Sequence, residues 1–521
     1  MGERVHRSVM NIKVGMLFFV LSLFLAFFSR KIFLDCLGAE FIGLTGMLMN
    51  IMSYLSVAEL GIGLSISYFL YKPLQEDNHD KINEVMSMLA FLYRRIGFFI
   101  GACGFVISLF FPWWFGHLSV SLFLVYFAFY SFLASSMAGY IFNYKNILVG
   151  ANQKQYLVSA YFQSISIVQS LVQIVLAYYY HNLYLWVVVG FVFTVIGIIL
   201  FNYRIRQLYP WLRIDLKEGR KNLKKYPDVL KKTRQILARK IKDLILYRSD
   251  DVFVGSFVSV TAVAFYSNYT MITYKLIYLL NILSDGFSAG IGNLLAEGDE
   301  KNIMKVYWEM TAFRFLIIGI VIFSLMMFFQ PFIACWLGDE YLLDELTVYL
   351  LILHIFIFQQ SILVYKFIES AGLFADVWMS WLELAVNLAV TFLLAPTYGI
   401  VGILLGKIIS LFFINFFWKP YYLFSQGFHK SVWVYWKGMA AYYILILLFA
   451  FCSLMLRLFV IDKYVDSLVT LVLYGIAVAV PLFAVYFLFL FQFTKGMKFL
   501  VARKPAVYQV VRRMTICHAH E

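Results

Sequence analysis

The chain has 521 residues, of which 62% are hydrophobic, 19% aromatic and only 14% charged, and its mean hydropathy is +0.80. Because ordinary globular proteins carry about 25% charged residues, this composition excludes a string of water-soluble domains. The net charge of +14 would suggest a nucleic-acid partner in a soluble protein, but Lys and Arg also collect in the cytoplasmic loops of membrane proteins. We therefore predict an all-α polytopic membrane protein with no nucleic-acid partner.

The apolar segments predict the membrane spans in chain order. A helix needs about 20 mostly apolar residues to cross the hydrocarbon core, and the sequence offers about fourteen such segments. After the first apolar run, Arg30 and Lys31 stand where a signal peptide would have a cleavage site, so we expect a retained helix. The expected spans are 14–34, 42–70, 88–111, 119–142, 157–180, 184–203, 244–258, 262–294, 306–328, 346–368, 378–395, 399–418, 438–460 and 467–493.

A long basic connection divides these spans into two groups. We expect an N-terminal lobe of helices 1–6 at residues 1–203, a cytoplasmic inter-lobe loop at 204–243, a C-terminal lobe of helices 7–12 at 244–420, and helices 13–14 with a basic cytoplasmic tail at 421–521. With the N-terminus inside, the expected outside loops hold one basic residue, Lys463, and lean acidic. The positive-inside rule therefore predicts that both termini are cytoplasmic, and it explains the net charge.

Charged residues within spans cost roughly 2.5–3.5 kcal/mol each on insertion scales, so they normally face a cavity or a partner. Several have an interfacial explanation: Arg94 and Arg95 can snorkel, and Glu309 and Arg314 lie near the start of their expected span. Five other cations lie in the first, seventh, eighth and twelfth spans, and Arg and Lys bind phosphate oxygens well. The substrate-binding candidates are Arg30, Lys31, Arg248, Lys275 and Lys407. The alternative is internal ion pairing, for example between Arg248 and Asp251.

Three acids inside spans have two open roles. Glu59, Asp250 and Asp251 can carry H⁺ or Na⁺, because burial raises the pKa of a carboxylate, or they can compensate the nearby cations. No Walker A motif, HExxH, GxSxG or CxxC occurs. We therefore expect no catalytic residues, no metal, no bound cofactor and no enzyme activity. The pairs Gly97/Gly101, Gly286/Gly290 and Gly402/Gly406 are small-residue faces that we expect to pack helices within the chain.

Five local stretches identify a family resemblance. Residues 37–44 (LGAEFIGL), 56–63 (SVAELGIG), 68–74 (YFLYKPL), 249–254 (SDDVFV) and 263–269 (VAFYSNY) resemble the Wzx-type O-antigen and capsule polysaccharide flippases of the multidrug/oligosaccharidyl-lipid/polysaccharide (MOP) exporter superfamily. The resemblance implies two six-helix lobes in a V around a cationic cavity, with two further C-terminal helices. It also implies a multi-pass protein of the bacterial cytoplasmic (inner) membrane.

The implied function is to flip undecaprenyl-pyrophosphate-linked oligosaccharide repeat units from the cytoplasmic to the periplasmic leaflet, by alternating access, for surface polysaccharide assembly. The implied partners are this lipid-linked substrate, the bilayer and the polysaccharide polymerase machinery. Arg30 falls where lipid II flippases of the superfamily carry a cavity arginine, but Lys31 stands where they place an acid. The main alternative is a cation-coupled multidrug antiporter, whose cavity should be acidic and whose first helix often contains a proline that is missing here. A membrane polymerase or ligase would need a larger outside loop than residues 330–345.

Overall fold

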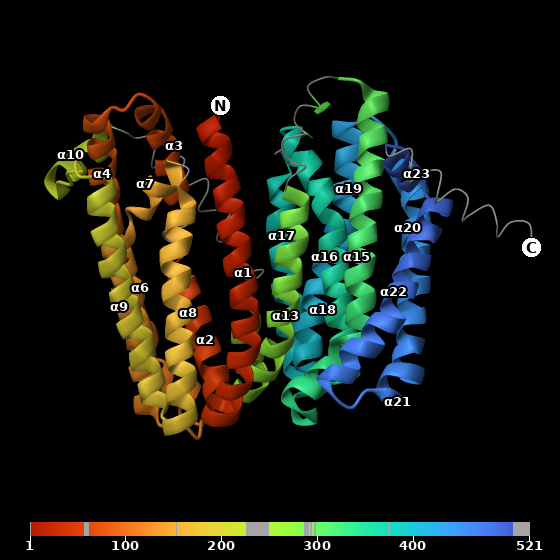
Figure 1. Ribbon diagram of the computed structural model, residues 1–521, viewed down its shortest axis with the longest axis horizontal. Coiled ribbons are helices and arrows are strands. Elements are labelled where there is room, and N and C mark those ends of the chain that lie inside the picture. Colours follow the sequence, from red (N-terminus) through yellow and green to blue (C-terminus); the bar gives the residue numbers. More distant parts are fainter. Residues whose placement is uncertain are drawn as a thin grey trace, which may run out of the picture. The chain divides into compact units, whose positions relative to one another are not determined.

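Helices build the described part of the chain, which comprises residues 2–56, 62–152, 154–225, 249–285, 291, 294–295, 298–373 and 376–503 of the computed structural model (Figure 1). No β-strand occurs in those ranges, so the predicted all-α class is confirmed. The chain separates into two compact units, residues 1–264 and 265–521, and each is described by itself. The expected lobe boundaries stay predictions, because residues 226–248 of the connection lie outside the described ranges.

Unit 1 is a bundle in which α1 packs against α8, and α6 packs against both α4 and α9. Helix ends carry their own caps: the Asn182 side chain accepts a hydrogen bond from the Leu185 amide at 3.1 Å, at the short turn between α8 and α9. The helices are α1 (Gly2–Leu37), α2 (Ala39–Leu55), α3 (Ile62–Gln75), α4 (His79–Ser108), α5 (Phe111–Phe115), α6 (Leu122–Asn143), α7 (Asn146–Ala151), α8 (Gln155–Tyr180), α9 (Leu183–Leu208), α10 (Leu216–Lys225), α12 (Asp250–Phe257) and the start of α13 (Val260–Asp285).

Unit 2 is organised around the long helix α15, which contacts α16, α20, α22 and α23. Aromatic side chains fill its core: the Tyr486 hydroxyl donates to the Phe315 carbonyl at 2.9 Å, and the ring lies 4.8 Å from that of Phe323. Its elements after α13 are α15 (Glu300–Leu337), η2 (Asp339–Tyr341), α16 (Glu345–Ser370), α17 (Val377–Tyr398), α18 (Ile400–Leu411), η3 (Phe412–Trp418), α19 (Lys419–Tyr422), η4 (Leu423–Gly427), α20 (Val432–Leu456), η5 (Arg457–Ile461), α21 (Asp462–Tyr464), α22 (Leu468–Phe493) and α23 (Lys495–Ala502).

Eleven helices within the described ranges are long and apolar enough to cross a membrane, so the protein is a multi-pass membrane protein. The exact count of about fourteen stays a prediction. The expected span 42–70 falls on α2 and α3, which have 17 and 14 residues and flank residues outside the described ranges. Helix α12 has only 8 residues and also follows such a gap. Helix α13 has 26 residues, but buried polar groups, among them Asn268, Thr270 and Thr273, interrupt its apolar sequence.

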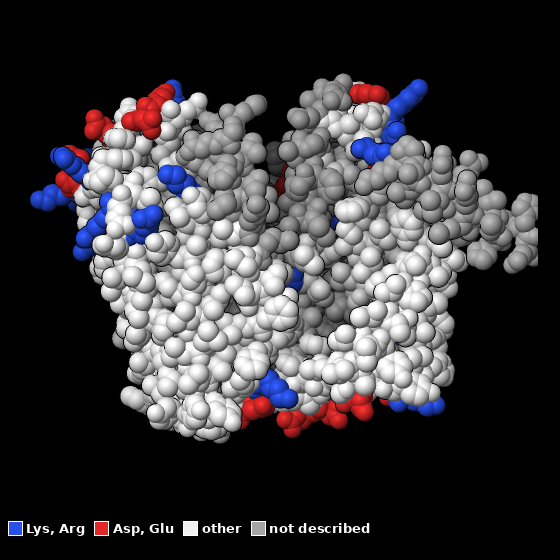
Figure 2. Space-filling view, viewed as in Figure 1, with Lys and Arg blue, Asp and Glu red and all other residues white. Residues whose placement is uncertain are grey.

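The surface of the spans is that of a protein immersed in lipid. Large apolar side chains stand exposed along them, including Phe24 at 71%, Leu447 at 71% and Phe459 at 70%. Apolar patches of this extent mark a membrane or partner surface. On the face shown in Figure 2, the described Lys, Arg, Asp and Glu side chains gather toward the two ends of the helices, and the belt between is almost uncharged. Each unit therefore presents a hydrocarbon-facing belt with charged ends.

Candidate functional site

Arg30 lies in the membrane-spanning part of α1 and faces protein. Its side chain is half-buried, and its Nη2 donates to the carbonyl oxygen of Ala264, near the start of α13, at 2.9 Å. This hydrogen bond holds the guanidinium against the start of α13. The next residue, Lys31, is exposed, because consecutive residues of a helix point about 100° apart. The two neighbouring cations therefore face different surroundings.

The acidic candidates of unit 1 lie in the first turn of α12, against α2. Asp251 accepts a hydrogen bond from Asn50 Nδ2 at 2.6 Å, and Asp250 is only 5% exposed. A carboxylate in the first turn of a helix interacts favourably with the helix dipole, so this placement also stabilises α12. The other two candidates of this group, Glu59 and Arg248, lie outside the described residues, and their place in the site stays a prediction.

Lys407 is buried in unit 2, on a helix that packs very closely against its neighbour. Its side chain is 5% exposed. A Cβ on Gly402 or Gly406 would lie 2.5 Å from the Leu394 carbonyl oxygen or 3.0 Å from that of Asn387, respectively, so α18 touches the backbone of α17. Lys275, the other candidate of unit 2, is half-buried on α13.

In the described residues, the small-residue faces pack helices of this chain against one another. Gly402 and Gly406 pack on α17, as above, and a Cβ on Gly97 would touch Ile141 and Tyr140 of α6 at 3.4 and 3.5 Å. The prediction of intrachain packing is therefore confirmed for these helices. Gly286 and Gly290 lie outside the described residues.

Arg314 and Glu309 are buried inside unit 2, and their interfacial position stays a prediction. Helix α15 begins at Glu300, earlier than the expected 306, so Arg314 lies about 21 Å along the helix at 1.5 Å per residue. Arg314 is 5% exposed, and its guanidinium donates to Gln359 Oε1 at 2.5 Å and to the Leu280 carbonyl at 3.2 Å. Glu309 is 2% exposed and forms an ion pair with Arg503, which follows α23. These charges hold elements of unit 2 together.

One buried ion pair escaped the sequence analysis. Lys419 Nζ lies 2.6 Å from Asp376 Oδ2, both side chains are more than nine-tenths buried, and the ammonium lies 4.7 Å from the centre of the Tyr365 ring. In the sequence each residue reads as a loop charge between spans. Only the tertiary approach of two segments 43 residues apart makes them a pair, so no local pattern could have revealed it.

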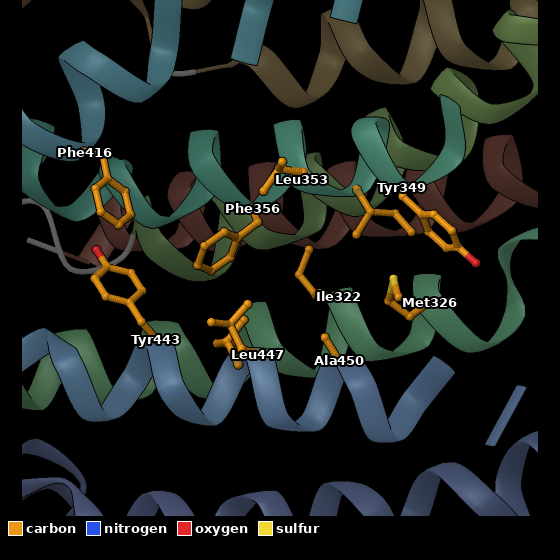
Figure 3. A pocket seen from close by; sticks show the side chains of 11 residues that line it. Ile322, Met326, Tyr349, Leu353, Phe356, Phe416, Tyr443, Leu447 and Ala450 are labelled. Carbon is orange, nitrogen blue, oxygen red and sulfur yellow. The ribbon is translucent and has the colours of Figure 1, made fainter. Parts of the chain in front are cut away.

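An apolar cavity of about 350 Å³ opens in unit 2 between α15, α16 and α20 (Figure 3). Its lining is almost wholly hydrocarbon and aromatic, with Tyr349 and Tyr443 toward opposite ends. Such a lining suits a hydrocarbon chain and offers no charge for a phosphate. Among the described residues, no group of three or more His, Cys, Asp or Glu side chains could hold a metal ion.

Known structures provide the comparison for this architecture. No family model and no curated protein matches the chain. The lipid II flippase MurJ, in an inward closed conformation, has a TM-score of 0.63 at 14% identity, with 92% of this chain and 99% of that chain covered. An inward-facing multidrug resistance MATE family transporter of the MOP superfamily has a TM-score of 0.57 at 14% identity, covering 79% and 97%. A mutant of the Vibrio cholerae MATE transporter VcmN has a TM-score of 0.51 at 16% identity, covering 82% and 100%. The chain therefore has the fold of the MOP superfamily transporters.

Proposed function

We propose that this protein flips undecaprenyl-pyrophosphate-linked oligosaccharide repeat units from the cytoplasmic to the periplasmic leaflet of the bacterial inner membrane, by alternating access. The observation that carries the proposal is the similarity to a lipid II flippase over 92% of this chain and 99% of the flippase. The MATE transporter of the same superfamily covers a smaller share, 79%, of this chain. A lipid-linked substrate thus has a precedent that shares nearly the whole length of this chain.

The charges support an anionic substrate. Arg30 lies in the span of α1 with a neutral carbonyl as an acceptor, and Lys407 is buried in the span that contains α18. A pyrophosphate is recognised by such cations, which provide charge-assisted hydrogen bonds to its oxygens. We assign the same role to Lys31, Lys275 and Arg248. The sugars and the polyprenyl chain then need no charged contact.

A second candidate is a cation-coupled multidrug antiporter. The MATE transporters of the same fold favour it, and so does the buried Asp250 beside Asp251 in unit 1, which could couple transport to H⁺ or Na⁺. Under this alternative, the acids of α12 would matter for drug resistance and Arg30 would not. The two candidates therefore depend on opposite charges.

The deciding experiment is a deletion strain examined for lipid-linked glycan repeats trapped on the cytoplasmic face. Trapped repeats and loss of surface glycan, both restored by the wild-type gene, are the expected result. Repeats that reach the outside normally would refute the flippase, and a strain that only becomes sensitive to organic cations would support the antiporter. Co-purification with the polymerase of the same glycan would test the expected assembly partner.

Charge-neutralising variants sharpen this experiment. Arg30→Gln keeps a polar side chain with N–H donors but removes the charge, and Lys407→Met keeps the length of the side chain. If each cation provides a charge-assisted contact of about 1.5–3 kcal/mol, flipping should fall roughly 10- to 100-fold. The control is Lys463→Gln, at an exposed lysine after α20. Full surface glycan in both test variants, at equal expression, would exclude these two residues from the site.

A further inference from the structure

The basic helix α10 is docked on α4 in a fixed orientation. Gly219 meets the Ser87 carbonyl oxygen so closely that a Cβ would intrude well inside 3.0 Å. The preceding non-helical segment is held in place as well, because the Arg213 amide donates to Asn83 Oδ1 at 2.9 Å and the Asp215 amide donates to Ser87 Oγ at 3.0 Å. The helix is therefore attached to a membrane-spanning helix through backbone contacts that any side-chain change on its outer face leaves intact.

A ring stack adds a further anchor at the same place. The imidazole of His79, the first residue of α4, lies parallel to the indole of Trp211, with ring centroids 3.9 Å apart and planes 8° apart. The Asn83 amide also approaches the Trp211 carbonyl at 3.5 Å. The connection from α9 to α10 thus passes the first residue of α4, and α10 lies beside the first turns of α4.

The docking turns a row of basic side chains outward. Gly219 and Asn222 face α4 and are buried, whereas Lys217, Arg220 and Lys221 are exposed. Their spacing of three and four residues places them on one side of the helix. Residues 211–225 hold six basic residues against two acidic ones, and one of those acids, Asp215, caps α10 by accepting from the Lys217 amide at 2.7 Å.

A further arginine lies deeper on the same face of α4. Arg94 follows Ser87 by seven residues, two helical turns, so it lies on the face that α10 covers, about 10 Å further into the span. Arg94 is exposed, and the remainder of α4 continues as an apolar membrane span. Arg94 and the basic row of α10 thus lie on either side of a space that suits a lipid phosphate. The apolar surface of α4 that continues into the span suits the acyl chains of the same phospholipid.

We propose that the outer face of α10 and Arg94 of α4 form a binding site for the headgroup of an anionic glycerophospholipid in the leaflet where α4 begins. A bilayer lipid is favoured over a nucleic acid or an acidic protein, because the site lies at the end of a membrane span and continues into an apolar surface. Basic residues near an anionic leaflet each strengthen binding measurably, and the effect is screened by salt. The site retains lipid at the edge of unit 1 independently of what the protein transports.

Native mass spectrometry of the purified full-length protein tests the site, with phosphatidylglycerol, phosphatidylethanolamine or undecaprenyl pyrophosphate added. The test variant is Lys217→Gln/Arg220→Gln/Lys221→Gln. Its affinity for phosphatidylglycerol should fall on the order of 100-fold at low salt, roughly fivefold for each charge removed. Arg94→Gln alone should lower it roughly fivefold. Both changes leave the Gly219, Asn83 and Ser87 contacts in place, and an unchanged melting temperature verifies this.

The matched control removes three exposed lysines of unit 2, as Lys301→Gln/Lys437→Gln/Lys498→Gln, with the same change in net charge. The control should keep the wild-type affinity for phosphatidylglycerol. The proposal is overturned if test and control variants lose phosphatidylglycerol equally or retain it equally, or if the wild type prefers phosphatidylethanolamine. Selective loss of undecaprenyl pyrophosphate, or of a short RNA probe, in the test variant would instead assign the surface to the substrate or to a nucleic acid. Binding is measured without transport, so failure of the flippase proposal leaves this test unaffected.

Discussion

Buried charges in unit 2 are held by two chemically different arrangements. Arg314 donates to neutral oxygens, of the Gln359 side chain and the Leu280 backbone. Lys419 instead has the carboxylate of Asp376 as its partner, and the two charges cancel. Lys419 is therefore a structural residue, although it is as deeply buried as the candidate Lys407.

Breaking the Lys419–Asp376 pair on one side should destabilise the protein strongly. Lys419→Met leaves the carboxylate of Asp376 buried without its cation, and removal of one partner from a buried pair typically costs about 3–5 kcal/mol. The double variant Lys419→Met/Asp376→Asn should recover most of this loss, because no isolated charge remains. Thermal unfolding in detergent measures both.

An exposed pair in the same unit provides the control. Lys430 lies 3.3 Å from Glu300, but the two side chains are 31% and 71% exposed, and solvent-exposed pairs contribute about 0–1 kcal/mol. Lys430→Met should therefore change the melting temperature little. A Lys419→Met variant as stable as Lys430→Met would show that the buried pair contributes nothing to folding.

At the scale of elements, glycines set how closely helices approach. Gly496, at the start of α23, lies against the carbonyl oxygen of Trp308 in α15 with no room for a Cβ. This approach lets Arg503, just after α23, reach the buried Glu309. The short helix α23 is thus attached to α15 at both ends, by a backbone contact and by an ion pair.

Gly496→Val should separate α23 from α15 and break the Glu309–Arg503 pair. Overpacking of this kind typically costs about 1–3 kcal/mol, and the released segment should become open to proteolysis. The matched control is Gly475→Ala in α22, where a Cβ would meet only the ring of Phe328 at an ordinary 3.7 Å. Limited proteolysis and thermal unfolding measure the two effects. Equal protection of the C-terminal segment in both variants would contradict the assigned role of Gly496.

The long apolar spans could be predicted from the sequence, because hydropathy is a property of neighbouring residues. Features that depend on contacts between distant segments could not be predicted in this way. Long apolar runs such as α9 and α22 have a hydropathy that no soluble helix sustains, so their spans could be recognised. Helix α13 carries buried polar residues such as Asn268, which only a packed neighbourhood makes tolerable, so hydropathy understates it. Helix α15 starts at Glu300, before the expected residue 306, because its first turns are polar and hydropathy does not detect them.

The candidate site could be predicted residue by residue but not as an assembly. Arg30, Lys407 and Asp250 stood out because charge is rare in apolar segments, and the structure places all three at least partly inside protein. Which partner each side chain meets depends on contacts between distant segments, such as that of Arg30 with Ala264. No periodicity in the sequence encodes those contacts.

For the whole molecule, the distribution of charge along α15 predicts the orientation in the membrane. This helix has 38 residues and so extends about 57 Å, enough to carry its ends beyond both faces of the hydrocarbon core. Lys301 is exposed at its start, and Glu340 is exposed just after its end, in an acidic connection to α16. By the positive-inside rule, we therefore expect the start of α15 to be cytoplasmic.

Single cysteines at these two positions should therefore react from opposite sides of the membrane. In a background with the native cysteines replaced by serine, Glu340→Cys should be labelled in intact spheroplasts by a membrane-impermeant maleimide, and Lys301→Cys only after permeabilisation. Both side chains are exposed, so a difference in labelling reports sidedness and not burial. The reverse pattern would place the basic start of α15 outside and would contradict the expected orientation. A flippase that moves its cargo outward requires the first pattern, since its substrate must enter from the leaflet that the basic residues mark.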